Sequence, residues 1–275
     1  MSHRKGVRLV VSALLLGGLA AQADIRDTIQ AATAGTTVQC SGTYTVSNTI
    51  TVPSGVTVKG PATFKFTNKT KNGFVVPSAN SNVTLQSLTV QGCLGAFKIQ
   101  GSGNKITSCI ANGCYYTGFE VNGSNSKNNT FTSCKAYNNA DAGTGGDTDG
   151  FAGKNGSSTG NKFMNCTAYS NSDDGFDYYY ANYPIVTSGC SAYSNGYYGG
   201  KTGNGVGFKM GGSGTSASHT FTSCTGNNQT SGNTARGFDS NNNGATLYLT
   251  TCRSYSNKNK DRLVNCSLTN CTMQQ

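Results

Sequence analysis

Six of the eleven acidic residues in the 275-residue chain lie within 37 consecutive positions. They are Asp141, Asp147, Asp149, Asp173, Asp174 and Asp177. Carboxylates held close together repel one another and raise one another's pKa, so such a cluster requires a compensating cation. A ligand set made only of oxygen atoms selects a hard ion, and calcium tolerates irregular geometry better than magnesium does. The cluster therefore predicts a calcium site.

A repeat places these aspartates relative to one another. The dipeptide Gly-Phe occurs at 118/119, 150/151, 175/176, 207/208 and 237/238, with spacings of 32, 25, 32 and 30 residues. With these dipeptides in line, Asp149 and Asp174 stack on successive units, and Asp177 lies beside Lys209. A polar turn is the simpler interpretation of one Asp-Asp-Gly segment alone. The shared register favours a metal site instead, formed by Asp149, Asp173, Asp174 and Asp177. It requires a bend at 174–175, because strict strand alternation directs residues 174 and 177 to opposite faces.

Lys209 lies in the strand-like segment 205–212, where a lysine is ordinarily a solvated side chain. Beside a bound cation its pKa is expected to fall, which makes the neutral amine accessible as a general base. A base next to a metal that neutralises a substrate carboxylate suits abstraction of the proton α to that carboxylate. In a 4-linked polyuronate, loss of the C5 proton and departure of the C4 oxygen cleave the chain by β-elimination.

The same repeat predicts the elements that position these residues. The unit Asn-x-apolar-x-x-Cys recurs at 104–109, 129–134 and 161–166, and each copy is followed by a Gly-Phe strand. A period of a few tens of residues, built from short strands and Gly/Asn turns, predicts a parallel β-helix. The repeated Asn is expected to form a ladder, and His219 occupies the Asn position in a variant copy. Residues 24–34 are expected to form a short amphipathic helix that caps the solenoid. No composition break divides residues 24–275, so we expect one domain.

Composition and the N-terminus indicate an exported protein. Only 12% of residues are charged, whereas Gly occurs 37 times, which argues against a helical protein. Residues 1–23 have a basic start, an apolar stretch and an Ala-x-Ala site, as a secretory signal peptide does. The remaining chain has a net charge of +7. We therefore expect a secreted monomer that binds an extracellular polyanion, with no nucleic-acid or membrane partner.

All eleven cysteines lie after residue 23. Export permits disulfide bonds, which we expect, and the odd count leaves at least one free thiol or an intermolecular bond. The alternative is that several cysteines are small buried hydrophobic residues stacked in the core. The repeat favours this alternative for Cys134, Cys166 and Cys224.

The segment 161–177, preceded by 147–152 and followed by 203–212, resembles the core of polysaccharide lyase family nine. The similarity is dense over about residues 129–212 and weaker through 235–241. It implies a right-handed parallel β-helix and a calcium-dependent pectate lyase that converts polygalacturonate into unsaturated products. Carried over by position, the resemblance implies that Asp149, Asp173, Asp174 and Asp177 hold calcium and that Lys209 is the base. Phe176 departs from the family pattern, in which many members have a Trp.

Other candidates carry weaker signals. Lys201 and Arg236 are predicted to pair with substrate carboxylates, although a solvated surface role fits them about as well. The segment Tyr178-Tyr179-Tyr180 could form a sugar-stacking wall, but packing at a strand end is the simpler interpretation. Two other function classes stay open: a glycoside hydrolase using paired carboxylates on the same fold, and a non-catalytic β-helix that binds polyuronate.

Overall fold

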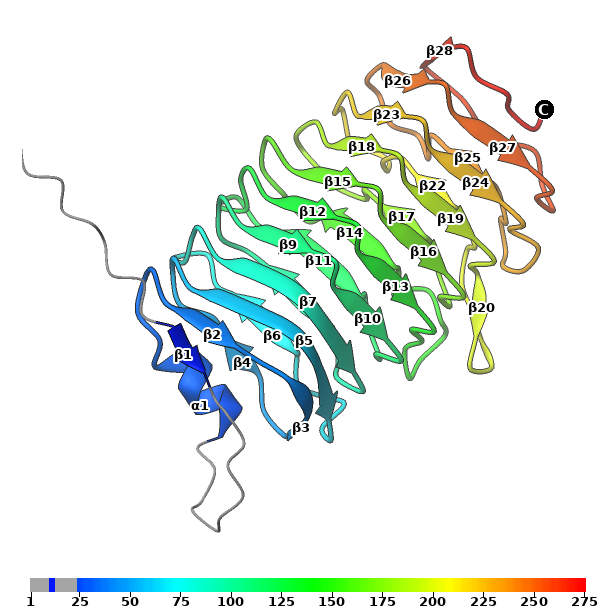
Figure 1. Ribbon diagram of the computed structural model, residues 1–275. Coiled ribbons are helices and arrows are strands. Elements are labelled where there is room, and N and C mark those ends of the chain that lie inside the picture. Colours follow the sequence, from blue (N-terminus) through cyan, green and yellow to red (C-terminus); the bar gives the residue numbers. More distant parts are fainter. Residues whose placement is uncertain (1–9, 13–23) are drawn as a thin grey trace, which may run out of the picture.

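A parallel β-helix extends through the computed structural model, which describes residues 10–12 and 24–275 (Figure 1). Each middle coil contributes three short strands, and each strand pairs in parallel with its counterparts on the neighbouring coils. The strands that follow the Gly-Phe dipeptides lie in one sheet, which we call the Gly-Phe sheet. Its strands are β4 (Ile50–Thr51), β6 (Phe74–Val76), β8 (Phe97–Ile99), β11 (Phe119–Asn122), β14 (Phe151–Lys154), β17 (Phe176–Asp177), β22 (Phe208–Lys209) and β25 (Phe238–Asp239). In β4 and β8 the dipeptide is replaced by Thr49-Ile50 and Ala96-Phe97. The predicted fold is confirmed.

The other two strands of each coil form two further ladders. The first contains β9 (Lys105–Thr107), β12 (Thr130–Thr132), β15 (Lys162–Met164), β18 (Val186–Ser188), β23 (Thr220–Thr222), β26 (Leu247–Thr250) and β28 (Cys266–Thr269). The second contains β10 (Ile110–Asn112), β13 (Lys135–Tyr137), β16 (Thr167–Tyr169), β19 (Ser191–Tyr193), β24 (Thr225–Asn227) and β27 (Arg253–Tyr255). The ladders meet through β7 (Thr84–Gln91), which pairs with both β9 and β10 and also with β5 (Thr57–Phe66).

The two ends of the solenoid differ. Helix α1 (Ile25–Gln30) is shorter than the predicted segment, but it buries Ile25 and Ile29 and packs on β4, as a cap should. Strands β2 (Thr37–Gln39) and β3 (Gly42–Val46) pair with β5. Strand β1 (Val10–Ser12) pairs with β2 and falls within the predicted signal peptide, whose other residues lie outside the described ones. No helix among the described residues is long and apolar enough to cross a membrane.

Phenylalanine rings stack through the core along the Gly-Phe sheet. On successive strands of this sheet, the rings from Phe97 to Phe238 lie with centroids 4.7 to 4.9 Å apart. The preceding glycines allow this packing, because a Cβ on Gly150 would lie 2.6 Å from the Cβ of Ala168. A Cβ on Gly175 would likewise lie 2.7 Å from Ala192. The glycines before β14 and β17 thus pack directly against alanines of β16 and β19.

Buried amide side chains form two ladders between coils. In the predicted ladder, the backbone N–H of Asn129 donates to Asn161 Oδ1, and that of Asn104 donates to Asn129 Oδ1. His219 continues this role, since its Nδ1 accepts the backbone N–H of Ile185. The second ladder lies at the turn that precedes the Gly-Phe sheet: Asn139, Asn171, Asn195, Gln229, Asn257 and Gln274. Both ladders satisfy backbone groups that the turns leave without strand partners.

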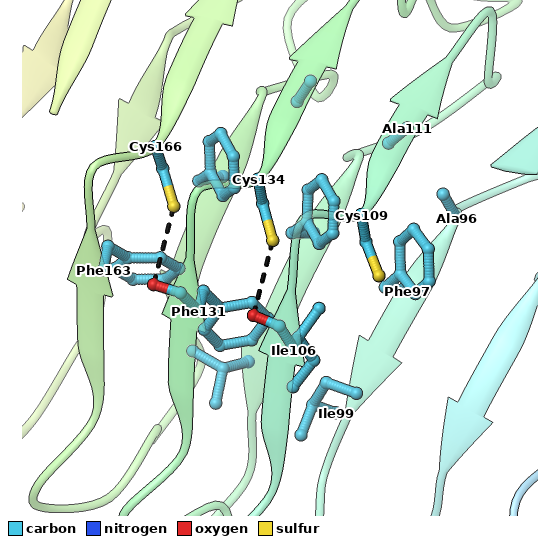
Figure 2. Close-up of a cluster of buried hydrophobic side chains, with 14 of the residues drawn as sticks. Ala96, Phe97, Ile99, Ile106, Cys109, Ala111, Phe131, Cys134, Phe163 and Cys166 are labelled. Carbon is cyan, nitrogen blue, oxygen red and sulfur yellow. Dashed lines mark hydrogen bonds between the residues drawn. The ribbon is translucent and has the colours of Figure 1, made fainter. Parts of the chain in front are cut away.

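The cysteines are free thiols, so the expectation of disulfide bonds is wrong for this structure. Figure 2 shows the thiols of Cys134 and Cys166 directed at the carbonyl oxygens of Ile106 and Phe131 on the preceding coil. The same contact recurs at Cys109, Cys190, Cys224, Cys252 and Cys271. Burial raises the pKa of Cys109 to about 12. The predicted alternative, a stack of buried thiols, is confirmed for Cys134, Cys166 and Cys224.

Candidate active site

Three aspartates converge where the turns enter β14 and β17. Asp149 and Asp174 each precede the glycine before a strand, and Asp177 ends β17. The predicted register is present, because Asp177 pairs with Lys209 on β22 and with Ala152 on β14. The required bend is present as well: residues 172, 173 and 175 are bends, and β17 begins only at Phe176. Strand alternation therefore does not separate Asp174 from Asp177.

One oxygen of each carboxylate is held by a backbone N–H. Asp149 Oδ1 accepts from Asp174 N at 3.2 Å, Asp174 Oδ1 from Val206 N at 2.8 Å, and Asp177 Oδ1 from Tyr179 N at 2.9 Å. Each of the three carboxylates offers an oxygen within 4.8 Å of the others, and all three side chains are buried. The main chain thus holds together three aspartates that come from different coils and are not all neighbours in the sequence.

Asp173 lies at the edge of this group. Its Oδ1 accepts the backbone N–H of Asn204 at 2.6 Å, and its Oδ2 is buried with no hydrogen-bond partner. The set of three mutually close carboxylates does not include it. The predicted four-aspartate site therefore consists of three converging carboxylates and a buried neighbour.

Two lysines enter the cluster from opposite sides. Lys209 Nζ lies 3.1 Å from Asp174 Oδ2 and 3.3 Å from Asp177 Oδ2. The contact with Asp174 is an ion pair that lacks hydrogen-bond geometry. Lys154 Nζ lies 2.6 Å from Asp149 Oδ2 and 2.9 Å from Asp177 Oδ2, with its side chain 10% exposed. Asp177 is therefore shared between the two ammonium groups.

Burial and charge shift the pKa values of these groups in different directions. Burial, with the neighbouring carboxylates, raises the pKa of Asp149 to about 7 and that of Asp173 to about 9. Burial opposes ionisation of Asp177 too, but Lys154 and Lys209 outweigh it and lower its pKa. For Lys209, burial favours the neutral amine, yet Asp174 and Asp177 prevail and raise its pKa. This is opposite to the expected fall, which presupposed a bound cation.

The cluster fits a hard cation. All of its potential ligand atoms are carboxylate oxygens. Asp173 Oδ2 is buried without a hydrogen bond, and Asp174 Oδ2 has only the Lys209 ammonium 3.1 Å away. Buried carboxylates left in this condition are costly unless a positive charge compensates them. An oxygen-only donor set of this kind is typical of calcium sites. Asp149, Asp174 and Asp177 would hold the ion, with Asp173 beside them.

The structure separates the other predicted site residues. Lys201 lies on β21 (Lys201–Thr202), which pairs with β20 (Tyr197–Tyr198) in a hairpin inserted before β22. Its Nζ donates to Ala142 O, and it lines a cavity of about 410 Å³ that Lys209 does not line. Arg236 lines a cavity of about 100 Å³ together with Lys209. The cavities place Arg236 beside Lys209, and Lys201 at a different location.

The three consecutive tyrosines have different surroundings. Tyr178 is completely buried and packs against Phe163 and Phe221, as the simpler interpretation predicted. The ring of Tyr179 is exposed at the surface, and Lys209 Nζ lies 5.5 Å from its centroid. Tyr180 is also exposed and contacts the ring of Tyr179. Only Tyr179 therefore contributes to the surroundings of the lysine.

Comparisons with known proteins identify the family of this β-helix. Residues 16–270 match the family described as the Pel9A-like right-handed β-helix region. The chain belongs to this family. It is 35% identical over 175 residues to pectate lyase L of Dickeya chrysanthemi and, to the same extent, to that of Dickeya dadantii (strain 3937). These matches cover 62% of this chain and 40% of each relative, so the matched region spans well under half of their length.

Solved structures show the same architecture. The crystal structure of pectate lyase Pel9A superimposes with a TM-score of 0.76 at 26% identity, covering 89% of this chain and 72% of that one. A rhamnogalacturonan lyase superimposes with a TM-score of 0.72 at 24% identity over 83% and 68% of the two chains, which shows a shared fold. The parallel β-helix that the repeat predicted is thus confirmed, and so is the right-handed twist that the family resemblance implied.

Sequence reasoning missed Lys154 among the residues of this site. On β14, Ala152 pairs with Asp177. Lys154 follows two residues later and therefore points to the same face of β14. Arg262 was missed as well, since the isolated bridge that pairs it with Asp239 lies outside the Gly-Phe repeat.

Proposed function

We propose that this Pel9A-like protein is a secreted, monomeric pectate lyase that cleaves polygalacturonate by calcium-assisted β-elimination. Lys209 is the general base, and Asp149, Asp173, Asp174 and Asp177 form the calcium site. The observation that carries the proposal is the position of Lys209, whose amine contacts two carboxylates of a buried oxygen cluster. The substrate is an acidic polysaccharide, and neither nucleic acid nor a membrane is a partner.

Proton transfer in the proposed reaction is carried out by Lys209. Lys209 Nζ, as the free amine, takes the C5 proton of a galacturonate residue. The electron pair of the broken C5–H bond forms the C4–C5 double bond, while the C4–O bond breaks and its oxygen leaves with the bonding pair. That oxygen gains a proton from solvent, so the products are a new chain end and a 4,5-unsaturated uronate. The side chain of Lys209 is 14% exposed, which leaves its nitrogen accessible from the surface of the Gly-Phe sheet.

Calcium, when bound, neutralises the substrate carboxylate and favours the negative charge that develops at C5. The protein fixes the aspartates through the backbone N–H groups of Asp174, Val206 and Tyr179. Lys154 keeps Asp149 and Asp177 paired with a positive charge. The net positive charge of the chain, +10 with the N-terminal segment, attracts a polyanionic sugar over long range.

The geometry favours a lyase over a hydrolase. Glycoside hydrolases place their two catalytic carboxyl groups roughly 5 to 9.5 Å apart so that sugar, and often water, fits between them. Here lysine amines lie 2.6 to 3.3 Å from oxygens of Asp149, Asp174 and Asp177, so all three carboxylates are paired with positive charge. A hydrolytic mechanism would also leave Lys209 without a role.

A single assay separates the three function classes. The mature protein is incubated with polygalacturonate at alkaline pH, with calcium or with a chelator, while ultraviolet absorbance and reducing ends are followed. We expect absorbance from the unsaturated uronate with calcium and its loss with the chelator. New reducing ends without absorbance would instead establish hydrolysis, and no product under either condition would favour a binding protein.

The calcium site is tested separately from turnover. In Asp174→Asn the amide oxygen still accepts the Val206 N–H, while the negative charge is removed. We expect calcium affinity measured by calorimetry to fall by at least tenfold, because a carboxylate ligand becomes neutral. Asp27→Asn, at an exposed position in α1, is the matched control. Unchanged affinity in Asp174→Asn would remove this residue from the ligand set.

A further inference from the structure

A small cavity adjoins Lys209 on the side toward the C-terminal coils. It has a volume of about 100 Å³, and charged side chains line it: Lys209, Arg236, Asp239 and Arg262. Successive coils supply these residues, since Lys209 pairs with Asp239 on β25 and Asp239 forms a bridge with Arg262. The cavity therefore continues the row of side chains that begins with Asp177 on β17.

Asp239 orients both arginines. Its side chain is 4% exposed, and its two oxygens point to different guanidinium groups. Arg262 Nε lies 2.7 Å from Oδ1, and Arg236 Nη1 lies 3.1 Å from Oδ2. Because the carboxylate is almost wholly buried and paired on both sides, the arginines are held in a fixed arrangement that solvent screens only in part.

Further contacts leave one edge of each guanidinium available. Arg236 Nε donates to Lys260 O at 2.9 Å, and Arg262 Nη2 donates to Asn241 Oδ1 at 3.2 Å. Within residues 24–275, the remaining amino groups, Arg236 Nη2 and Arg262 Nη1, donate no hydrogen bond to the protein. The arginine side chains are 25% and 38% exposed, so an anion arriving from solvent can reach them.

The charges of the cavity are unbalanced. Arg236 and Arg262 supply two positive charges against Asp239, the one carboxylate in the lining. Lys209 is already paired with Asp174 and Asp177 outside the cavity. Its volume is below the roughly 300 to 1,000 Å³ of pockets that enclose a whole small molecule. A cavity of this size and charge suits one anionic group of a larger ligand that lies across its mouth. Planar guanidinium groups bind a carboxylate through paired hydrogen bonds.

We propose that Arg236 and Arg262, oriented by Asp239, form a carboxylate subsite for the uronate residue next to the one that Lys209 deprotonates. This rests on the proposed lyase function and adds a rule for substrate selection. Neighbouring coils are stacked about one strand spacing apart, roughly 4.8 Å. The subsite therefore fixes the position of the sugar chain along the Gly-Phe sheet relative to Lys209. A methyl ester at the bound residue removes the negative charge and is selected against.

The kinetic test compares four variants. Arg236→Met and Arg262→Met remove the guanidinium groups, Arg262→Lys retains charge without the planar fork, and Arg253→Met is the control, at an exposed arginine on β27. With polygalacturonate, we expect KM to rise about tenfold for each methionine variant, as loss of a charge-assisted hydrogen bond implies. Arg262→Lys should fall between Arg262→Met and the wild type. The preference for unesterified over methyl-esterified substrate should shrink in parallel.

A binding measurement separates this subsite from the proposed reaction. In a Lys209→Ala background, calorimetry with saturated oligogalacturonates should show about tenfold weaker binding once Arg236→Met or Arg262→Met is added. Unchanged KM and unchanged binding, in variants that unfold at the wild-type urea concentration, would overturn the subsite and leave the arginines a purely structural role. If Arg262→Met does not fold, Arg262→Lys and Arg236→Met decide the question.

The two proposals fail in distinguishable ways. A wild-type protein that makes no unsaturated product, but binds oligogalacturonates through these arginines, would refute the lyase function and retain the subsite. A wild-type protein that makes the product with a KM indifferent to both arginines would retain the lyase function and refute the subsite.

Discussion

Lys154 Nζ lies 2.6 Å from Asp149 Oδ2, inside the carboxylate cluster proposed to hold calcium. The same nitrogen reaches Asp177 Oδ2 at 2.9 Å, so the lysine bridges aspartates on two successive coils. A buried cluster of carboxylates that binds a metal ion must also be stable in the metal-free protein. Lys154 supplies the compensating positive charge in that state, and it contacts the same oxygens that a metal ion would use.

Replacing Lys154 with Met should therefore destabilise the metal-free protein and strengthen metal binding. Removing one partner of a buried ion pair typically costs about 3 kcal/mol or more. We expect a loss of that size in urea unfolding with a chelator, a smaller loss with saturating calcium, and tighter calcium binding by calorimetry. Lys162→Met, at an exposed position on β15, should change none of these quantities. An equal loss of stability with and without calcium would contradict this role.

Replacing Lys209 with Ala should abolish turnover while the circular dichroism spectrum stays unchanged. Lys209→Arg is the sharper test, because arginine keeps the positive charge beside Asp174 and Asp177 but does not deprotonate in proteins. We expect both variants to lack lyase activity. Lys135→Ala, on β13 and exposed, should remain fully active. Activity retained in Lys209→Arg would show that this residue contributes charge and that the base is elsewhere.

The Asn ladder that leads into the site should matter for both stability and metal affinity. Asn171 Nδ2 donates to Asn195 Oδ1 and to Ala136 O, and its Oδ1 accepts from Asn139 Nδ2. Asn171→Ala leaves buried partners unsatisfied, which costs about 1–3 kcal/mol for each group. Because Asp173 follows two residues later, we also expect weaker calcium binding. Urea unfolding measures the loss of stability and calorimetry the calcium affinity, with Asn48→Ala, at an exposed position, as control. Wild-type stability in Asn171→Ala would show that the ladder bonds are dispensable.

His219 should make folding sensitive to acid. Burial lowers its pKa from 6.5 to about 3, so the unfolded chain binds a proton between these values and the folded chain does not. The histidine's contribution to the free energy of unfolding is therefore fully present above pH 6.5 and is lost as pH falls toward 3. In His219→Asn this dependence disappears, because asparagine does not titrate and can accept the same Ile185 N–H.

Unfolding in urea at pH 7 and pH 4.5 measures the difference for wild type and variant. We expect the wild type to lose on the order of a few kcal/mol more than the variant between these pH values. All carboxylates are common to both proteins, so their titration cancels in the comparison. Parallel losses would show that His219 is protonated in the folded state.

The repeat made the central part of the site predictable. Gly-Phe dipeptides mark equivalent positions because their rings stack at a nearly constant spacing, from Phe119 to Phe238. Once these positions are aligned, the pairing of Asp177 with Lys209 follows, and the structure contains that pairing. The parallel β-helix and the Asn ladder were predictable for the same reason, since both depend on patterns that recur. The capping helix was predictable from a single local pattern, the amphipathic segment 24–34.

Features outside the repeat were not predictable in this way. Lys201 lies on an inserted hairpin, whose position relative to the coils no register fixes. Lys154 and Arg262 act through long side chains that reach across coils, so their partners depend on rotamers and packing. The expected disulfide bonds are absent among the described residues, because export only permits such bonds. Most of the thiols instead point at a carbonyl oxygen of the preceding coil, as those of Cys134 and Cys166 do.

The column of buried thiols also makes the opening of individual coils measurable. Because most coils carry one such cysteine at an equivalent corner, an alkylating reagent can modify that thiol only after its coil has opened. Cys266 on β28 and Cys271 just after it are half-buried and should react first. Cys134 and Cys166, in the middle of the solenoid, should react last. Mass spectrometry of the alkylated peptides would then give the order in which the coils open, without any engineered cysteine.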